Sequence, residues 1–220
     1  FQVGSGSACI TGVVATEPIE PGQILMRVPM GLVLSEANLG HEGVLPGVRL
    51  PESLPQSTRL ALQLIAEMAR KESWRQPYLD VLPRSCPHCY SQWSAAQRAE
   101  LHGLDNTLVW RDDAGRARQA RQDYHRFDID EIYEDQLAHL FATNPAAFPS
   151  TLYNKTSYEA ALFLVRSRQY EIDYPGVEAS EAGNTEGGIV PMMDMMNHEW
   201  GGAEWEVDGD TLQIRALPPA

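Results

Sequence analysis

The segment that decides the fold is Gly188–His198, which reads Gly-Ile-Val-Pro-Met-Met-Asp-Met-Met-Asn-His. The segment begins with an apolar run, which is followed by an acidic residue, further methionines and an Asn-His pair. This pattern predicts a buried strand over 189–193 that runs into a polar loop. The methionines are typical of core filling, because their flexible side chains fit irregular space.

Strands are also expected near the start of the chain. Apolar and β-branched runs at 13–15 and 24–28 lie on either side of Glu20-Pro21-Gly22-Gln23. Such residues favour strands. Proline followed by glycine at the centre of the turn suits a type II turn, in which the glycine takes a positive φ.

The last fifty residues give a second set of strand signals. Residues 174–187 are rich in Gly, Glu and Ser, which predicts an exposed loop before the strand at 189–193. Runs at 204–207 and 211–214 then flank Asp208-Gly209. An Asp-Gly pair between two strand-like runs is a strong hairpin signal.

Between these ends, apolar residues recur at helical spacing. Ser57 is the expected N-cap of a helix over 57–72. Its apolar face consists of Leu60, Ala61, Leu64, Ile65 and Met68. Thr156-Ser157-Tyr158-Glu159 has a capping-box pattern that predicts the start of another helix, and apolar residues over 129–141 predict a third.

The order of strands, helices and strands predicts an α+β fold in which a mainly helical insertion splits one β-rich domain. The expected boundaries are 1–56 for the first β part, 57–155 for the insertion and 156–220 for the second β part. Each β part has few strands of its own, so the two are expected to need one another to close a sheet.

The charge balance restricts the class of partner. Seventeen Lys and Arg residues against thirty Asp and Glu give a net charge of −13 at pH 7. Such a surface disfavours nucleic-acid phosphates and favours a basic or neutral protein surface. There is no run of about 18 apolar residues to span a membrane, and no signal-peptide pattern. An intracellular monomer is the expectation.

The cysteines argue weakly for a reducing compartment. There are three, Cys9, Cys86 and Cys89, an odd number that does not suit a secreted disulfide framework. Cys86-Pro87-His88-Cys89 has the spacing of a zinc half-site, but a tetrahedral site needs a second pair of ligands. Two ordinary loop thiols and no metal is the favoured interpretation, and a zinc ribbon that also uses His102 is the remote alternative.

Four motifs in a fixed order point to a family. They are Gly12–Pro29 (Gly-Val-Val-Ala-Thr-Glu at its start), Trp74–Pro83, Ser167-Arg168-Gln169 and Pro191–His198. In this order and spacing the chain resembles SET-domain protein methyltransferases along essentially all of its length. More narrowly, it is similar to the branch that includes the Rubisco large-subunit lysine methyltransferases and the actin-histidine methyltransferases.

The resemblance implies a cofactor, S-adenosylmethionine, and a set of residues that bind it. These residues are Gly12, Val13, Arg168, Asp194, Asn197 and His198. Arg168 is expected to pair with the cofactor's carboxylate, which suits a planar and permanently charged guanidinium. Asn197 and His198 are expected to hold its amino-acid and adenine ends, and Asp194 to order the loop. Taken singly, Arg168 is equally typical of a surface helix end.

The activity implied is methylation of a protein side chain, with lysine as the preferred acceptor and histidine as the alternative. In the family a tyrosine of a Tyr-Gly pair orients the acceptor. No Tyr-Gly pair occurs in residues 1–220, so the catalytic tyrosine and the substrate-binding domain are expected beyond Ala220. The rival interpretation is a cofactor- or protein-binding module without turnover, with Trp74, Tyr78, Trp93 and Trp110 on a docking face. A Rubisco substrate would imply a plastid, and actin or a ribosomal protein the cytoplasm, so the intracellular compartment is left open among cytoplasm, nucleus and plastid.

Overall fold

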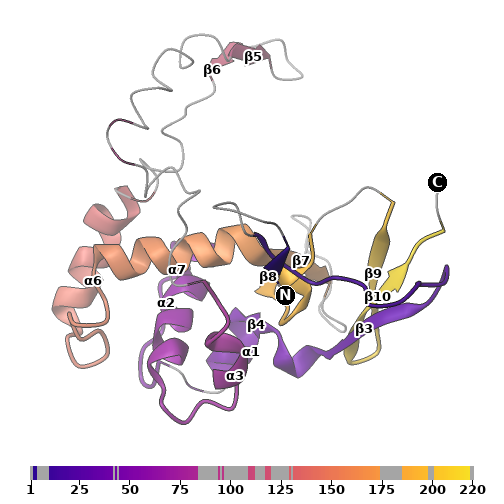
Figure 1. The fold of residues 1–220 in the computed structure, drawn as a ribbon. Helices are drawn as coiled ribbons and strands as arrows, with labels where there is room; N and C mark the ends of the chain where they lie inside the picture. Colours follow the sequence, from indigo (N-terminus) through magenta and orange to yellow (C-terminus); the bar gives the residue numbers. More distant parts are fainter. Residues whose placement is uncertain are drawn as a thin grey trace.

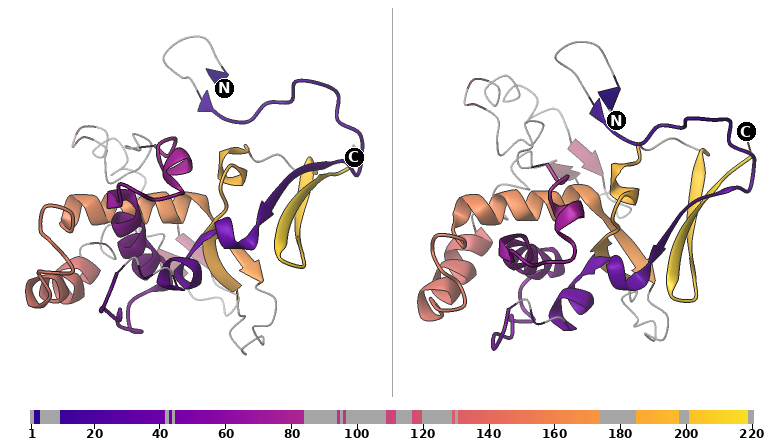
Figure 2. Two further views of the ribbon diagram at one scale, coloured as in Figure 1. Left: turned by 90° about the horizontal axis from the view of Figure 1, so that it is seen from below. Right: turned by 60° about the horizontal axis from the view of Figure 1, so that its bottom comes forward.

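A computed structural model describes residues 2–3, 10–41, 43, 45–83, 94, 96, 109–111, 117–119, 129, 131–173, 185–197 and 201–218. It shows helices together with antiparallel sheets, so the predicted α+β class is confirmed. Figure 1 and both views of Figure 2 place α6 at one end of the molecule and the sheet of β3, β9 and β10 at the other. No helix in the described part of the chain is long and apolar enough to cross a membrane.

The helical part is built around two long helices, α2 (Gln56–Ala69) and α7 (Lys155–Arg168), which pack against each other. The smaller helical elements are α1 (Glu36–His41), α3 (Gln76–Leu79), the π-helical turn η3 (Tyr133–Leu137) and α6 (Ala138–Thr143). The apolar face predicted for α2 lies in the core, where Leu60, Ala61 and Leu64 have no exposed surface. The predicted helix is therefore confirmed.

The starts of both long helices differ from the predictions. In α7 the cap is Asn154, whose Oδ1 accepts from the Ser157 backbone N–H at 3.1 Å, while the Asn154 N–H donates to Ser157 Oγ at 3.2 Å. The capping box thus begins at Asn154 and not at Thr156. In α2, Pro55 occupies the cap position and Ser57 lies inside the helix, because the backbone carbonyl of Pro55 already accepts the Thr58 and Arg59 N–H groups.

Two three-stranded antiparallel sheets each combine strands from opposite ends of the sequence. The first has the order β3-β10-β9 and the second the order β4-β8-β7. Their strands are β3 (Ile24–Pro29), β4 (Leu34–Ser35), β7 (Gln169–Asp173), β8 (Thr185–Ile189), β9 (Ala203–Asp208) and β10 (Thr211–Ala216). Two further pairs are short: β1 (Gln2–Val3) with β2 (Ile10–Thr11), and β5 (Val109–Arg111) with β6 (Ala117–Gln119).

A second core lies under these sheets, separate from that of the helices. Its buried members are Val28, Met30, Val33, Ile172, Val190, Met193, Leu212 and Ile214. Strand β8 approaches this core very closely: a Cβ on Gly188 would lie 2.7 Å from Val33 Cγ1. A glycine is therefore needed there. Met30 belongs to the 3-10 turn η1 (Met30–Leu32), which joins β3 to β4.

Both turn predictions are confirmed, whereas two of the strand predictions are wrong in whole or in part. Gly22 has φ +80°, and the β9–β10 hairpin forms around Gly209, as expected for both. Residues 13–15, however, form no strand, and Val13 and Val14 are exposed. The strand expected over 189–193 ends at Ile189, where its pairing with β4 and β7 also ends. The structure describes only 185–187 of the loop predicted at 174–187, and those residues form the start of β8.

Candidate functional site

The chain turns sharply where it leaves β8. Met192 has φ 69°, and it is the only non-glycine residue with positive φ among the described residues. This left-handed conformation is costly for a residue with a side chain, and such strain clusters at functional sites. It leads into the 3-10 turn η4 (Met193–Met195), in which the Asp194 N–H donates to the Val190 carbonyl at 3.2 Å.

Asp194 forms an ion pair with Arg168, which lies in the last turn of α7. Arg168 Nη1 is 2.6 Å from Asp194 Oδ2 and also donates to the Asp194 carbonyl oxygen at 3.2 Å. The Asp194 side chain has no exposed surface, whereas 19% of the Arg168 side chain is exposed. The arginine therefore fixes the turn after β8 while part of its side chain still reaches solvent.

The charge of Asp194 is set by opposing effects. Burial raises the pKa of this carboxyl above its usual range, and Arg168 and Tyr78 both act to lower it. The remaining oxygen, Oδ1, is buried and has no fully formed hydrogen bond among the described residues. The Tyr78 hydroxyl is close enough to influence the Asp194 pKa, but the contact falls short of hydrogen-bond geometry, and this hydroxyl too is buried without a full partner.

The rival interpretation places Tyr78 on a docking face, but its hydroxyl is buried and acts on the pKa of Asp194. A buried ion pair places it there: Arg75 Nη1 lies 3.5 Å from Glu67 Oε1 of α2, and Arg75 Nη2 donates to the Gly31 carbonyl at 3.3 Å. Helix α3 follows directly and carries Tyr78. Sequence reasoning missed this role, although Tyr78 lies within the Trp74–Pro83 motif that signalled the family.

A second tyrosine flanks the same turn. The Tyr170 hydroxyl, from the first residues of β7, donates to the Met193 carbonyl at 3.3 Å. Its pKa is raised, first by burial and then by the negative charge of Asp194, while Arg168 acts in the opposite direction. Tyr170 is thus a neutral donor that supports the turn from the side of the β4-β8-β7 sheet.

Gly12 and Val13, which were expected to bind the cofactor, lie against the other side of this loop. The Val13 N–H donates to the Met195 carbonyl at 3.3 Å. A Cβ on Gly12 would lie 2.9 Å from Asn197 Nδ2 and 3.5 Å from the Met195 carbonyl oxygen. Gly12 is buried and Asn197 is exposed, so the backbone of 12–13 lies directly against 195–197, with the Asn197 side chain open to solvent.

The structure thus gathers five of the six predicted residues around one turn: Gly12, Val13, Arg168, Asp194 and Asn197. His198 lies outside the described residues. Cys9, Cys86, Cys89, Trp93 and His102 also lie outside them, and no metal-binding group of His, Cys, Asp and Glu occurs among the residues that are described. Trp74 is exposed, as the docking-face interpretation expects.

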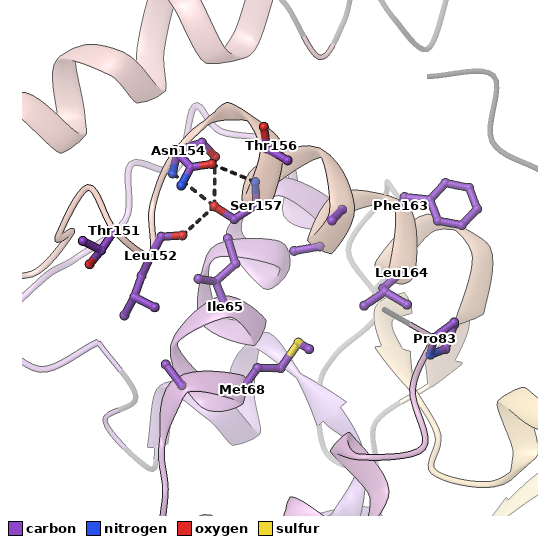
Figure 3. A pocket seen from close by; sticks show the side chains of 13 residues that line it. Ile65, Met68, Pro83, Thr151, Leu152, Asn154, Thr156, Ser157, Phe163 and Leu164 are labelled. Atoms are coloured by element: carbon purple, nitrogen blue, oxygen red, sulfur yellow. Dashed lines mark hydrogen bonds between the residues drawn. The ribbon is translucent and has the colours of Figure 1, made fainter. Parts of the chain in front are cut away.

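An apolar cavity lies elsewhere. It has a volume of about 440 Å³ and is formed between α2 and α7 by Ile65, Met68, Leu152, Phe163 and Leu164 with smaller neighbours. Figure 3 shows these apolar side chains around it, with the Asn154–Ser157 capping box at one edge. None of the described residues that line this cavity is charged, whereas the turn at Asp194 carries an ion pair, so the candidate site remains that turn.

Comparison with known proteins identifies the fold. No protein-family profile matches the chain. Over 202 residues it is 27% identical to protein-lysine N-methyltransferase EFM1 of Saccharomyces cerevisiae, an alignment that covers 82% of this chain and 34% of that protein. It also matches the crystal structure of the SET domain of LSMT bound to lysine and AdoHcy, with a TM-score of 0.64 and 20% identity over 93% of this chain and 43% of that one.

These matches confirm the SET-domain resemblance that the four motifs predicted. The likeness to LSMT extends over nearly the whole chain and establishes a SET-domain fold. The chain spans about a third of the length of its curated relative and less than half of the matched structure.

Proposed function

We propose that this chain is the S-adenosylmethionine-binding part of a protein-lysine N-methyltransferase. The observation that carries the proposal is the convergence of Gly12, Val13, Arg168, Asp194 and Asn197 around one strained turn of a SET-domain fold. The relative EFM1 is named as a protein-lysine methyltransferase, and the LSMT structure holds lysine and AdoHcy. Both names support lysine over the alternative acceptor, histidine.

The residues present fit such a cofactor. S-adenosylmethionine has a carboxylate, an ammonium group and a flat adenine, and when bound it supplies a methyl group carried on a sulfonium. Among the described residues Arg168 is hydrogen-bonded through Nη1 alone, and 19% of its side chain is exposed, so the rest of its planar fork can receive a carboxylate. Gly12 has no side chain to block the approach, and the exposed Asn197 amide lies beside it.

The chain's own groups would act mainly by positioning. Asp194 fixes the guanidinium, the Met195 carbonyl holds the 12–13 backbone, and Tyr170 holds the Met193 carbonyl. A preformed arrangement of this kind lowers the entropic cost of binding and of bringing reactants together. The net charge of −13 suits a substrate segment that carries cationic lysines.

Calorimetric titration with S-adenosylhomocysteine tests the proposal. The intact chain should bind, and Arg168→Ala should weaken binding by about tenfold or more, since hydrogen bonds to charged groups contribute about 1.5–3 kcal/mol. Arg49→Ala is the matched control, because Arg49 is an exposed arginine paired only with Glu52 on the surface. Absence of binding by the intact chain, or equal binding by Arg168→Ala, would contradict the proposal.

Transfer of a labelled methyl group to a lysine-rich protein separates the enzyme from the binding module. The full-length gene product should label lysine, identified by mass spectrometry of the modified peptide. Labelled histidine would support the alternative acceptor. Cofactor binding without transfer would favour the binding-module interpretation.

A further inference from the structure

Two buried polar atoms at the candidate site have no fully formed hydrogen bond among the described residues. They are Asp194 Oδ1 and the Tyr78 hydroxyl, one an acceptor and the other a donor. Buried polar groups are rarely left without a partner, and each exception calls for an explanation. Each side chain shifts the pKa of the other, so the two groups that lack a partner are neighbours.

Tyr78 is held in this place by contacts that have no part in the proposed cofactor binding. Arg75, three residues earlier, pairs with the fully buried Glu67 and lies over the Trp74 ring, with its guanidinium carbon 4.2 Å from the ring centroid. The Tyr78 N–H donates to the Arg75 carbonyl at 2.9 Å. Helix α3 is thus fixed to α2, and the position of the Tyr78 ring is determined before any ligand binds.

The raised pKa of Tyr78 suits its hydroxyl to act as a hydrogen-bond donor. Burial raises its pKa far above the usual value near 10, and the Asp194 charge raises it further. The hydroxyl is therefore protonated at neutral pH and can donate a hydrogen bond. Asp194 in turn has one oxygen engaged by Arg168, and its other oxygen, Oδ1, is buried without a hydrogen-bond partner among the described residues.

We propose that Tyr78 is a positioning residue for the cofactor site: its hydroxyl holds the second oxygen of Asp194, and Asp194 thereby holds Arg168 in a single orientation. This inference rests on the proposed function for its effect on cofactor affinity. It gives the helical insertion expected over 57–155 a part in the site, because Tyr78 lies in that range whereas Arg168 and Asp194 lie in the range 156–220 that was expected to form the second β part. Tyr78 itself does not touch the cofactor in this proposal.

The competing explanation is that Tyr78 only fills the core, and a second tyrosine provides the control. Tyr153 is also buried in the helical part, its pKa is also raised by burial, and its hydroxyl donates to the Leu62 carbonyl at 3.3 Å. Replacing either tyrosine by Phe removes one buried hydroxyl and keeps the ring. Of these two tyrosines, Tyr78 is the one that neighbours Asp194.

The first experiment compares Tyr78→Phe and Tyr153→Phe in calorimetric titration with S-adenosylhomocysteine, well below both melting temperatures. Tyr78→Phe should weaken binding about five- to tenfold, because a buried acceptor next to Arg168 loses its donor. Tyr153→Phe should remain within about twofold of the original, although its melting temperature should also fall by about 2–4 °C. Equal affinities for Tyr78→Phe and the original chain would overturn the proposal.

The second experiment needs no ligand and separates this proposal from the proposed function. Melting temperatures are measured for Tyr78→Phe, Asp194→Asn and the double variant. If Tyr78 serves Asp194, the double variant should lose clearly less than the sum of the single losses. Additive losses would refute the Tyr78–Asp194 contact even if the chain binds cofactor. Non-additive losses in a chain that binds no S-adenosylhomocysteine would refute the proposed function and leave the contact standing.

Discussion

Two buried carboxylates, Glu67 and Asp194, differ in how completely they are satisfied. Both side chains have no exposed surface and both pair with an arginine. Both Glu67 oxygens are engaged: Ser73 Oγ donates to Oε1, which Arg75 also approaches, and Arg70 donates to Oε2 at 2.9 Å. Asp194 has a full partner on one oxygen only.

The difference separates a carboxylate that supports the fold from one that belongs to a site. A fully bonded buried ion makes its surroundings rigid, whereas an incompletely bonded ion beside a strained residue is typical of a functional region. Glu67 anchors the segment that carries Tyr78, and Tyr78 is the residue proposed to hold Asp194. Glu67 thus acts on Asp194 indirectly, through the position of Tyr78.

The largest expected effect is on the Glu67 side. Arg75→Met should lower the free energy of unfolding by about 1.5–3 kcal/mol, because the fully buried Glu67 carboxylate loses one of its two arginine partners while Arg70 and Ser73 stay bonded to it. Urea unfolding followed by circular dichroism measures this. Arg49→Met, at an exposed pair, should stay within about 0.5 kcal/mol. Similar values for the two variants would mean that the buried pair does not anchor α3.

Asp194→Asn should show the reverse balance of stability and binding. The free energy of unfolding should fall by only about 1–2 kcal/mol, since the change retains one hydrogen-bonding oxygen and relieves the burial of a charge. Affinity for S-adenosylhomocysteine should fall by about tenfold, because Arg168 loses its charged anchor. Glu67→Gln is the counterpart, and it should lose more stability than affinity. Unchanged affinity in Asp194→Asn would remove the distinction between the carboxylates.

The pH dependence of stability gives a sharper test of Asp194. Its pKa is raised in the folded state, so the folded chain holds this proton more tightly than the unfolded chain. The contribution of Asp194 to the free energy of unfolding therefore falls as the pH rises from the usual pKa near 3.9 through the folded pKa, and is constant above it. The urea midpoint of the original chain minus that of Asp194→Asn should decline over this window. A rising difference would mean that Arg168 outweighs burial.

The smallest expected effect concerns the strained residue beside Asp194. Met192→Gly should raise the free energy of unfolding by about 0.5–1 kcal/mol, because glycine adopts positive φ without steric cost but loses more entropy on folding. Met192 is 48% exposed, so little packing is lost. The matched reverse change is Gly22→Ala at φ +80°, where a Cβ would meet nothing within 4 Å, and this change should destabilise by a similar amount. A destabilised Met192→Gly would show that the Met192 side chain matters more than its backbone.

Much of the fold was predictable where the signal is local. The helix at α2 and the β9–β10 hairpin follow from apolar spacing and from Asp208-Gly209, which act over a few residues. The strand predicted at 13–15 does not form. Apolar and β-branched residues favour a strand, but a strand also needs a partner strand, which these residues do not specify. The start of α7 was misplaced because Asn154, two residues before Thr156, supplies the cap.

The site was predictable only in part. Arg168, Asp194 and Asn197 were selected through motifs shared with a family, since each alone is an ordinary loop or helix-end residue. Tyr78 could not be assigned to the site from the sequence, because its contact with Asp194 depends on where the Glu67–Arg75 pair places α3. Such a contact joins three separate segments, and no spacing in the sequence reports it.

The pairing of β3 with β10 affects folding during translation, because the two strands are synthesised far apart in time. Arg215, at the far end of β10, donates to the Gly22 carbonyl just before β3, 193 residues away. At a synthesis rate of about 5–20 residues per second, β3 leaves the ribosome on the order of ten seconds or more before its partner. Throughout that interval its backbone hydrogen-bonding groups are open to any other strand. Nascent chains of this protein should therefore depend on chaperones during translation, and a stall between β3 and β10 should favour aggregation.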